Sequence, residues 1–257
     1  MPIEVTLSAA TPIAFLLVMA RVSGALIFVP LPGISSAPGP ARIVLSLAFT
    51  LALASRWPAV DPSAVTLARL AGWAAAEAAI GIAIGVAISI VLEAFSFAAQ
   101  LLSLPAGYGY ASTVDPNTQA DSGILLVLAQ LVAGMLFFAL GLDREILKLF
   151  ALSLDRIPAG AYMFGPASAQ ALVRLSATLF SVGVRLALPV VALLVMVDVA
   201  LALLGRLNAQ LQLLSLAFPA KMLAALVMLA WLVELYPRIL LEYAGQAFAV
   251  GRRVVGL

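Results

Sequence analysis

Residues 67–104 read LARLAGWAAAEAAIGIAIGVAISIVLEAFSFAAQLLSL, and this stretch decides the fold class. Nearly all of its side chains are apolar, and the polar exceptions include Glu77, Glu93 and Gln100. A helix that spans a bilayer needs about 20 mostly apolar residues. This stretch is longer than one crossing, so it predicts a membrane helix that is kinked, strongly tilted or projecting beyond the bilayer.

The spacing of residues within this stretch places polar side chains on one helix face and also gives a pair of small residues four positions apart. Glu93, Ser96 and Gln100 lie three and four residues apart and therefore share one helix face. Gly81 and Gly85 lie four apart, a pattern that lets a second helix approach closely. The simpler interpretation is that alanine and glycine only pack a helical bundle.

The composition of the whole chain extends the same conclusion. Of 257 residues, 64% are hydrophobic and 10% are charged, whereas soluble domains carry about 25% charged residues. The net charge of +2 has no basic cluster, which argues against a nucleic-acid surface. The absence of cysteine and histidine excludes thiol catalysis, Cys/His zinc sites and a Ser/His protease. We expect a membrane protein with no catalytic, cofactor or metal site.

The remaining chain alternates apolar segments with breaks rich in proline and glycine. We expect an all-α, multi-pass membrane protein built of long, kinked helical hairpins, with one membrane domain over residues 1–257. Residues 30–40 are too rich in helix breakers to be helical, and Pro189 is expected to interrupt its segment. The segment 143–156 is amphipathic and should lie at the membrane interface, and the tail from residue 237 is amphipathic as well. The expected helices cover residues 12–29, 43–57, 67–104, 124–142, 143–156, 167–204 and 216–235.

Several charges fall inside the apolar segments. Arg174 and Arg185 lie eleven residues apart, which brings them within roughly 20° of each other on a helix. This polar stripe should face protein or water, because arginine at mid-depth in lipid is costly. Glu77, Glu93 and Asp198 need partners for the same reason. Arg21 lies about ten residues into its helix, so burial against a partner's carboxylate is favoured over snorkelling to the lipid surface.

Three groups of residues, taken in order along the chain, carry a resemblance. The first group is Arg21-Val-Ser-Gly-Ala-Leu-Ile-Phe-Val-Pro30 with Gly39-Pro40 and Arg42. The second group is Glu77, Gly81 and Gly85, followed by Gly107-Tyr-Gly-Tyr-Ala-Ser-Thr-Val-Asp-Pro116. The third group is Leu188-Pro189, Leu203-Leu-Gly-Arg206, Gln210-Leu211 and Phe218-Pro219. Together they resemble the FliR/SctT family of export-gate subunits. Ala209 and Ala217 depart from the family pattern, which favours proline and glycine there.

The resemblance implies a structural and gating subunit of a type III protein-export channel in the bacterial inner membrane. Such a subunit packs with FliP-like and FliQ-like membrane subunits into a helical gate, and meets FlhB-like and FlhA-like export components, membrane lipid and unfolded exported polypeptides. The flagellar system, with its basal body, is favoured over the injectisome only because it is more common.

The resemblance also places a plug in the loop from residue 107 to residue 115. Glycines would give this loop mobility, and tyrosines would give it bulk whose hydroxyl ends tolerate water. The alternative is an ordinary interhelical loop. The residues expected to form the plug are Gly107, Tyr108, Gly109, Tyr110, Val114, Asp115 and Pro116.

Other interpretations stay open at this stage. Arg206 and Gln210 either lock a turn that contacts partner subunits, or are a helix-end arginine that seeks lipid phosphate and a solvated glutamine. A secondary transporter would use buried carboxylates and broken helices such as those near Asp198, but the chain shows no internal repeat. An intramembrane aspartyl enzyme using Asp143 and Asp198 is disfavoured, since Asp143 opens an amphipathic helix.

Overall fold

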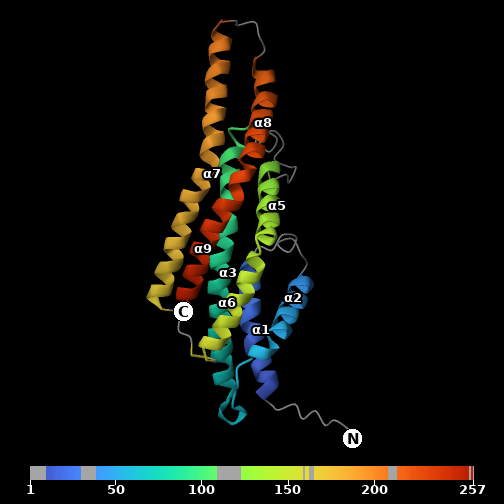
Figure 1. Cartoon of the computed structure of the whole chain (residues 1–257), viewed down its shortest axis with the longest axis vertical. Coiled ribbons are helices and arrows are strands. Elements are labelled where there is room, and N and C mark those ends of the chain that lie inside the picture. Colours follow the sequence, from blue (N-terminus) through green and yellow to red (C-terminus); the bar gives the residue numbers. More distant parts are fainter. Residues whose placement is uncertain are drawn as a thin grey trace. The chain divides into compact units, whose positions relative to one another are not determined.

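The computed structural model describes residues 10–29, 39–108, 123–158, 160–161, 165–207, 213–254 and 256. All regular structure within these ranges is helical, which confirms the predicted all-α fold (Figure 1). The α-helices are α1 (Ala10–Phe28), α2 (Gly39–Ala52), α3 (Leu67–Ser103), α5 (Ile124–Ala139), α6 (Leu142–Arg156), α7 (Pro166–Leu207), α8 (Leu213–Leu232) and α9 (Tyr236–Val254). Short 3-10 turns are η1 (Ala54–Arg56), η2 (Pro62–Ala64) and η3 (Val233–Leu235).

Long apolar helices confirm the multi-pass membrane assignment. Among the described residues, four helical stretches are long and apolar enough to cross a bilayer: Ala10–Phe28, Leu67–Ser103, Pro166–Arg206 and Ala217–Val254. The pair α5 and α6 is bent by 63°, and it adds a fifth crossing if it forms one broken span. The bend falls at Gly141, whose φ of +69° is easily adopted by glycine.

Two expectations about proline were wrong. Helix α2 begins at Gly39, inside the stretch expected to be non-helical, because Pro40 occupies the first turn, where no backbone N–H is needed. Helix α7 continues through Pro189 instead of being interrupted there. Leu186, Val190 and Leu194 form a buried stripe across the proline, so packing supports the helix on both sides of it.

The last apolar segment also divides differently from the expected helix over 216–235. Helix α8 begins at Leu213 and ends at Leu232, and the short turn η3 links it to α9. The amphipathic tail is therefore a regular helix that begins at Tyr236. Its basic end carries Arg252 and Arg253, where cations interact favourably with the helix dipole.

The contacts of the chain group into two compact units. Unit 1 comprises residues 1–90, 141–176 and 244–257, and unit 2 comprises residues 91–140 and 177–243. Helices α3, α7 and α9 each contribute one part to either unit. The single membrane domain expected over residues 1–257 stays a prediction.

In unit 1, α1 packs against α3 at backbone distance. A β-carbon at Gly81 would lie 1.9 Å from the carbonyl oxygen of Arg21, and one at Gly85 would lie 2.5 Å from that of Ala25. Only glycine fits at either position, so the close approach predicted from the spacing is present. It holds α1 and α3 in a fixed register, which places the side chains between them.

The amphipathic helix α6 also belongs to unit 1. It carries Asp143 and Glu145 in its first turn and Arg156 in its last, as the helix dipole favours. Its polar face is exposed, and Lys148 pairs there with Glu145 at 2.6 Å. Its buried face includes Leu142, Ile146, Leu149, Phe150 and Leu154, which recur at helical spacing. The predicted amphipathic helix is therefore present, and its placement at the membrane interface stays a prediction.

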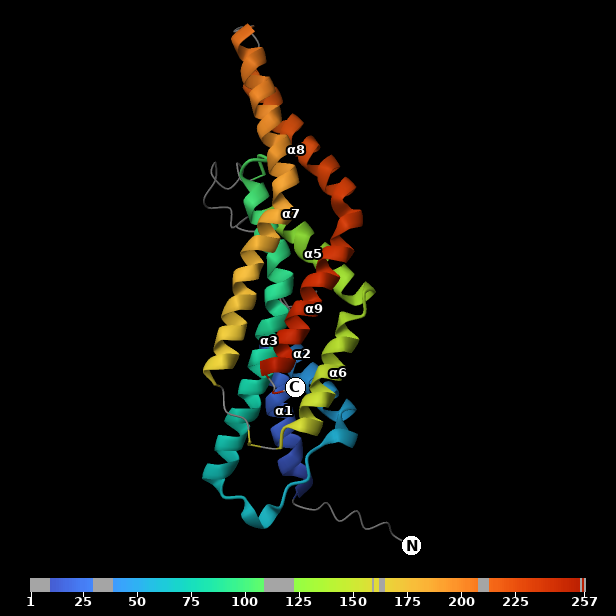
Figure 2. The ribbon, with the colours of Figure 1, turned by 60° about the vertical axis from the view of Figure 1, so that its left-hand side comes forward.

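Unit 2 contains an antiparallel hairpin formed by the second half of α7 and by α8 (Figure 2). Helix α3 packs on α7 through aromatic side chains, with the rings of Phe97 and Phe180 edge to face at 5.2 Å. Gly183 lets this contact form, because a β-carbon there would lie 2.5 Å from Cδ1 of Phe97.

Candidate functional site

A buried ion pair joins α1 and α3 in unit 1. Nε of Arg21 donates to Oε2 of Glu77 at 2.5 Å, and the two side chains are only 1% and 3% exposed. The sequence favoured burial of Arg21 against a partner's carboxylate. In the structure, the carboxylate that pairs with Arg21 is Glu77 of the same chain, a residue that the sequence also predicted to need a partner.

Two further contacts extend this pair to α6 and to the loop after it. Nη1 of Arg21 donates to Oγ of Ser153 at 2.9 Å, and the backbone N–H of Gly160 donates to Oε1 of Glu77 at 3.3 Å. Ser153 in turn donates to the carbonyl of Phe150 at 2.8 Å. We call Arg21, Glu77, Ser153 and Gly160 the Arg21 cluster. This cluster joins α1, α3, α6 and the loop after α6 at one buried site.

Gly160 is required for a steric reason as well. Its φ of +73° is rare for other residues, and a β-carbon would lie 1.8 Å from Cδ1 of Trp73 on α3. The loop after α6 is therefore pressed against α3 at this glycine. Sequence reasoning missed both Ser153 and Gly160; the available signal was a glycine two residues after Pro158, where a turn is common.

In unit 2, the structure describes the start of the predicted plug loop. The hydroxyl of Tyr108 donates to the backbone carbonyl of Met222 on α8 at 3.2 Å. Partial burial raises the pKa of Tyr108, which is consistent with a protonated hydroxyl that donates. Gly107 has a φ of +86°, and a β-carbon there would lie 3.2 Å from Cδ1 of Phe218. The loop thus begins in contact with α8.

The other residues of the predicted plug lie outside the described residues. They are Gly109, Tyr110, Val114, Asp115 and Pro116.

A second ion pair ties the hairpin of unit 2 together. Lys221 on α8 pairs with Oδ1 of Asp198 on α7, and the side chains are 17% and 49% exposed. Asp198 was predicted to need a partner, whereas Lys221 was missed. Its signal was a single basic residue in a helix that is otherwise apolar.

Comparison with known proteins decides the family. A family model described as bacterial export proteins, family 1, matches residues 13–247. The chain belongs to this family.

Its curated relatives include flagellar biosynthetic proteins FliR from three bacteria. That of Escherichia coli (strain K12) is 27% identical over 207 residues, covering 79% of this chain and 78% of the relative. That of Caulobacter vibrioides is 28% identical over 218 residues, covering 83% and 86%, and that of Bacillus subtilis (strain 168) is 27% identical over 223 residues, covering 84% of each. These matches confirm the resemblance noted in the sequence. They support a component of the flagellar export apparatus in the bacterial inner membrane.

The other charges predicted in this export protein lie on the surface of the chain. Glu93 is exposed on α3 and is hydrogen-bonded by Ser96 one turn away. Arg174 and Arg185 are exposed on α7, and Arg206 is exposed in its last turn rather than in a break after it. Their contact with partners stays a prediction, and Gln210 lies outside the described residues.

Proposed function

We propose that this export protein is a structural and gating subunit of the flagellar protein-export channel. In this proposal it forms part of a pore for unfolded polypeptides, and the loop from residue 107 to residue 115 plugs that pore. The observation that carries the proposal is the contact between Tyr108 and the backbone of Met222, which holds the first residues of the loop against α8.

The nature of this contact suits a seal that must open. A single hydrogen bond of this kind contributes about 1 kcal/mol to stability, so it can hold a loop in place and still break at small cost. Met222 accepts through its backbone, so the acceptor persists whatever side chain α8 carries there. The positive φ of Gly107 supplies the turn that directs the chain from α3 toward α8.

The proposed partners are FliP-like and FliQ-like membrane subunits, together with FlhB-like and FlhA-like components. Two features of α7 support a protein neighbour. Arg174 and Arg185 are both exposed, and large apolar side chains such as Phe180, Leu188 and Met196 are more than half exposed. A carboxylate on a neighbouring helix would relieve the cost of arginine in an apolar setting. Membrane lipid would cover what the partners leave exposed.

Two of the carboxylates that a transporter could use, Glu77 and Asp198, give that alternative no support. Glu77 is occupied by Arg21 and by the backbone of Gly160, and Asp198 is occupied by Lys221. Neither acid is placed to bind a solute or coupling ion without first breaking an ion pair.

The test is to delete residues 107–115 in cells that express the complete export apparatus. We expect normal assembly, increased leak of ions and small solutes, and export that persists or falls only modestly, because the loop blocks the path and does not drive transport. A matched variant replaces the same residues with glycine and serine at constant length, which separates loss of side chains from shortening of the connection. It should leak as well.

Normal assembly without increased permeability in both variants would remove this loop from the seal. A transporter would instead lose uptake without a leak. Co-purification addresses the partners separately: the chain expressed alone should be polydisperse in size-exclusion chromatography, and co-expression with the neighbouring subunits should give one defined complex. A stable monodisperse monomer would count against an obligate assembly.

A further inference from the structure

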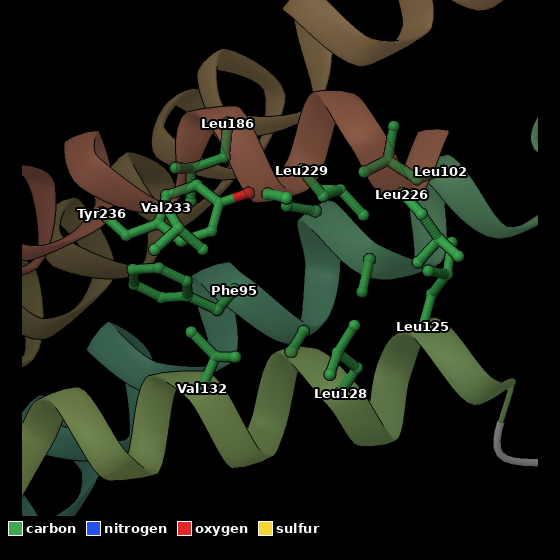
Figure 3. A pocket seen from close by; sticks show the side chains of 14 residues that line it. Phe95, Leu102, Leu125, Leu128, Val132, Leu186, Leu226, Leu229, Val233 and Tyr236 are labelled. Atoms are coloured by element: carbon green, nitrogen blue, oxygen red, sulfur yellow. The ribbon is translucent and has the colours of Figure 1, made fainter. Parts of the chain in front are cut away.

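Unit 2 encloses an apolar cavity of about 380 Å³ (Figure 3). Side chains from α3, α5, α7 and α8, together with the first residues of η3 and α9, line it. In Figure 3, Phe95, Leu128 and Val132 approach the space from one side, and Leu186, Leu226 and Leu229 approach it from the other. We propose that this cavity binds one acyl chain of a membrane lipid.

The chemistry of the lining excludes water as the stable occupant. Tyr236 contributes the only side-chain oxygen among the lining residues, and its ring packs edge to face on Phe95 at 5.9 Å. A buried water needs two to four polar partners, which this lining does not offer. An empty cavity is also unfavourable, since its cost grows with its volume. An apolar occupant satisfies both conditions.

The mouth of the cavity connects it to the surroundings of the chain. Three lining residues are themselves partly exposed: Leu128 by 41%, Leu226 by 40% and Val233 by 46%. All three lie on apolar helical segments of a multi-pass membrane protein, where the surrounding solvent is hydrocarbon. A lipid chain can therefore enter without crossing water.

The dimensions of the cavity suit a single hydrocarbon chain better than a helix of a neighbouring subunit. The lining runs from Phe95 to Leu102 on α3 and from Leu125 to Val132 on α5, which is about 10 Å along each helix. A helix with its side chains is about 10 Å across, which is the full length of this lining, whereas a hydrocarbon chain carries no side chains. An extended strand would fit, but it would bury unpaired N–H and C=O groups. A flexible hydrocarbon chain fits and has no polar group to satisfy.

The test labels lipid in native membranes of cells that express the complete export apparatus. Cells are fed a fatty acid with a diazirine in its acyl chain, the membranes are irradiated, and adducts on this chain are mapped by mass spectrometry. We expect adducts on Leu128 and the neighbouring lining residues to exceed several-fold those on Met135, which is 72% exposed on α5 and does not line the cavity.

A filling variant and a matched control make the test specific. Ala129→Phe places a ring in the cavity and should reduce the lining adducts several-fold, while the adducts on Met135 persist. Ala139→Phe adds the same ring at an exposed position of α5 outside the cavity and should change neither.

Two outcomes would overturn the proposal. One is lining adducts no more frequent than those on Met135, or unaffected by Ala129→Phe. The other is cross-linking of the lining to a partner subunit in place of lipid. If Ala129→Phe fails to accumulate, the comparison of wild-type adducts on Leu128 and Met135 still decides. The proposal does not depend on the plug, because lipid binding is measured without reference to permeability.

Discussion

The described residues of each unit include an ion pair between two α-helices, and these two pairs differ most in burial. Arg21 and Glu77 of unit 1 are 1% and 3% exposed, and two more hydrogen bonds satisfy them from α6 and the loop after it. Asp198 and Lys221 of unit 2 are 49% and 17% exposed, at a hairpin of two helices. Buried charges are expensive to leave unpaired, whereas exposed pairs contribute little.

This difference assigns different roles to the two units. The Arg21 cluster fixes how α1, α3 and α6 pack, so its loss should act on folding and accumulation of the chain. In unit 2, the contact of Tyr108 with Met222 and the pair of Lys221 with Asp198 are both partly exposed. Their loss should leave the fold intact and should change what the assembled protein does.

The largest effect is expected for Glu77→Gln. The substitution leaves Arg21 charged and buried without a counter-ion, which should lower the free energy of unfolding by about 3–5 kcal/mol. Thermal unfolding of the purified complex and the amount of complex in membranes both measure this. Glu242→Gln, on the exposed face of α9, is the matched control and should resemble wild type.

A double variant sharpens the same prediction. Arg21→Met combined with Glu77→Leu removes both charges and keeps the volume apolar, so it should recover much of the lost stability. If the single and double variants lose equal stability, the unpaired charge of Arg21 is not the cause of the loss.

The next effect is expected for Gly160→Ala. The added β-carbon meets Trp73 and forces a side chain into a positive φ, so unfolding should become easier by more than about 1 kcal/mol. Gly165→Ala is the control, because a β-carbon there meets no atom within 4 Å. If the two variants unfold alike, the loop is not pressed against α3.

A small effect is expected for Lys221→Ala. With the exposed part of Asp198 facing water or a polar partner surface, losing this pair should change the free energy of unfolding of the complex by about 0–1 kcal/mol. Lys221→Arg keeps the charge and serves as the comparison. A loss as large as that of Glu77→Gln would mean that Asp198 faces lipid rather than water or a polar partner surface, and the contrast between the units would fail.

The sequence predicted the fold class because composition and apolar length are enough for it. It also predicted the close approach at Gly81 and Gly85, which depends only on local spacing. It missed the pairing of Arg21 with Glu77, because 56 residues separate them and the register of α1 on α3 selects the partner. The prediction that Pro189 interrupts its segment was wrong, since tertiary packing across the proline outweighs one missing backbone hydrogen bond.

The candidate site was predictable only where it depends on local sequence. The glycine and tyrosine content of the loop after α3 pointed to residues 107 and 108, but a backbone acceptor on α8 leaves no trace in the sequence. Lys221 and Ser153 were missed because each is a single polar residue whose importance comes only from a distant partner.

The most direct test of this account is the ratio of ion leak to assembled complex in cells that express the whole export apparatus. Tyr108→Phe removes only the hydroxyl that contacts Met222, so it should leave the amount of complex unchanged and raise the ratio. Glu77→Gln should lower the amount of complex and leave the ratio at the wild-type value. A raised ratio for Glu77→Gln, or an unchanged ratio for Tyr108→Phe, would contradict the division between a unit that holds the fold and a unit that holds the seal.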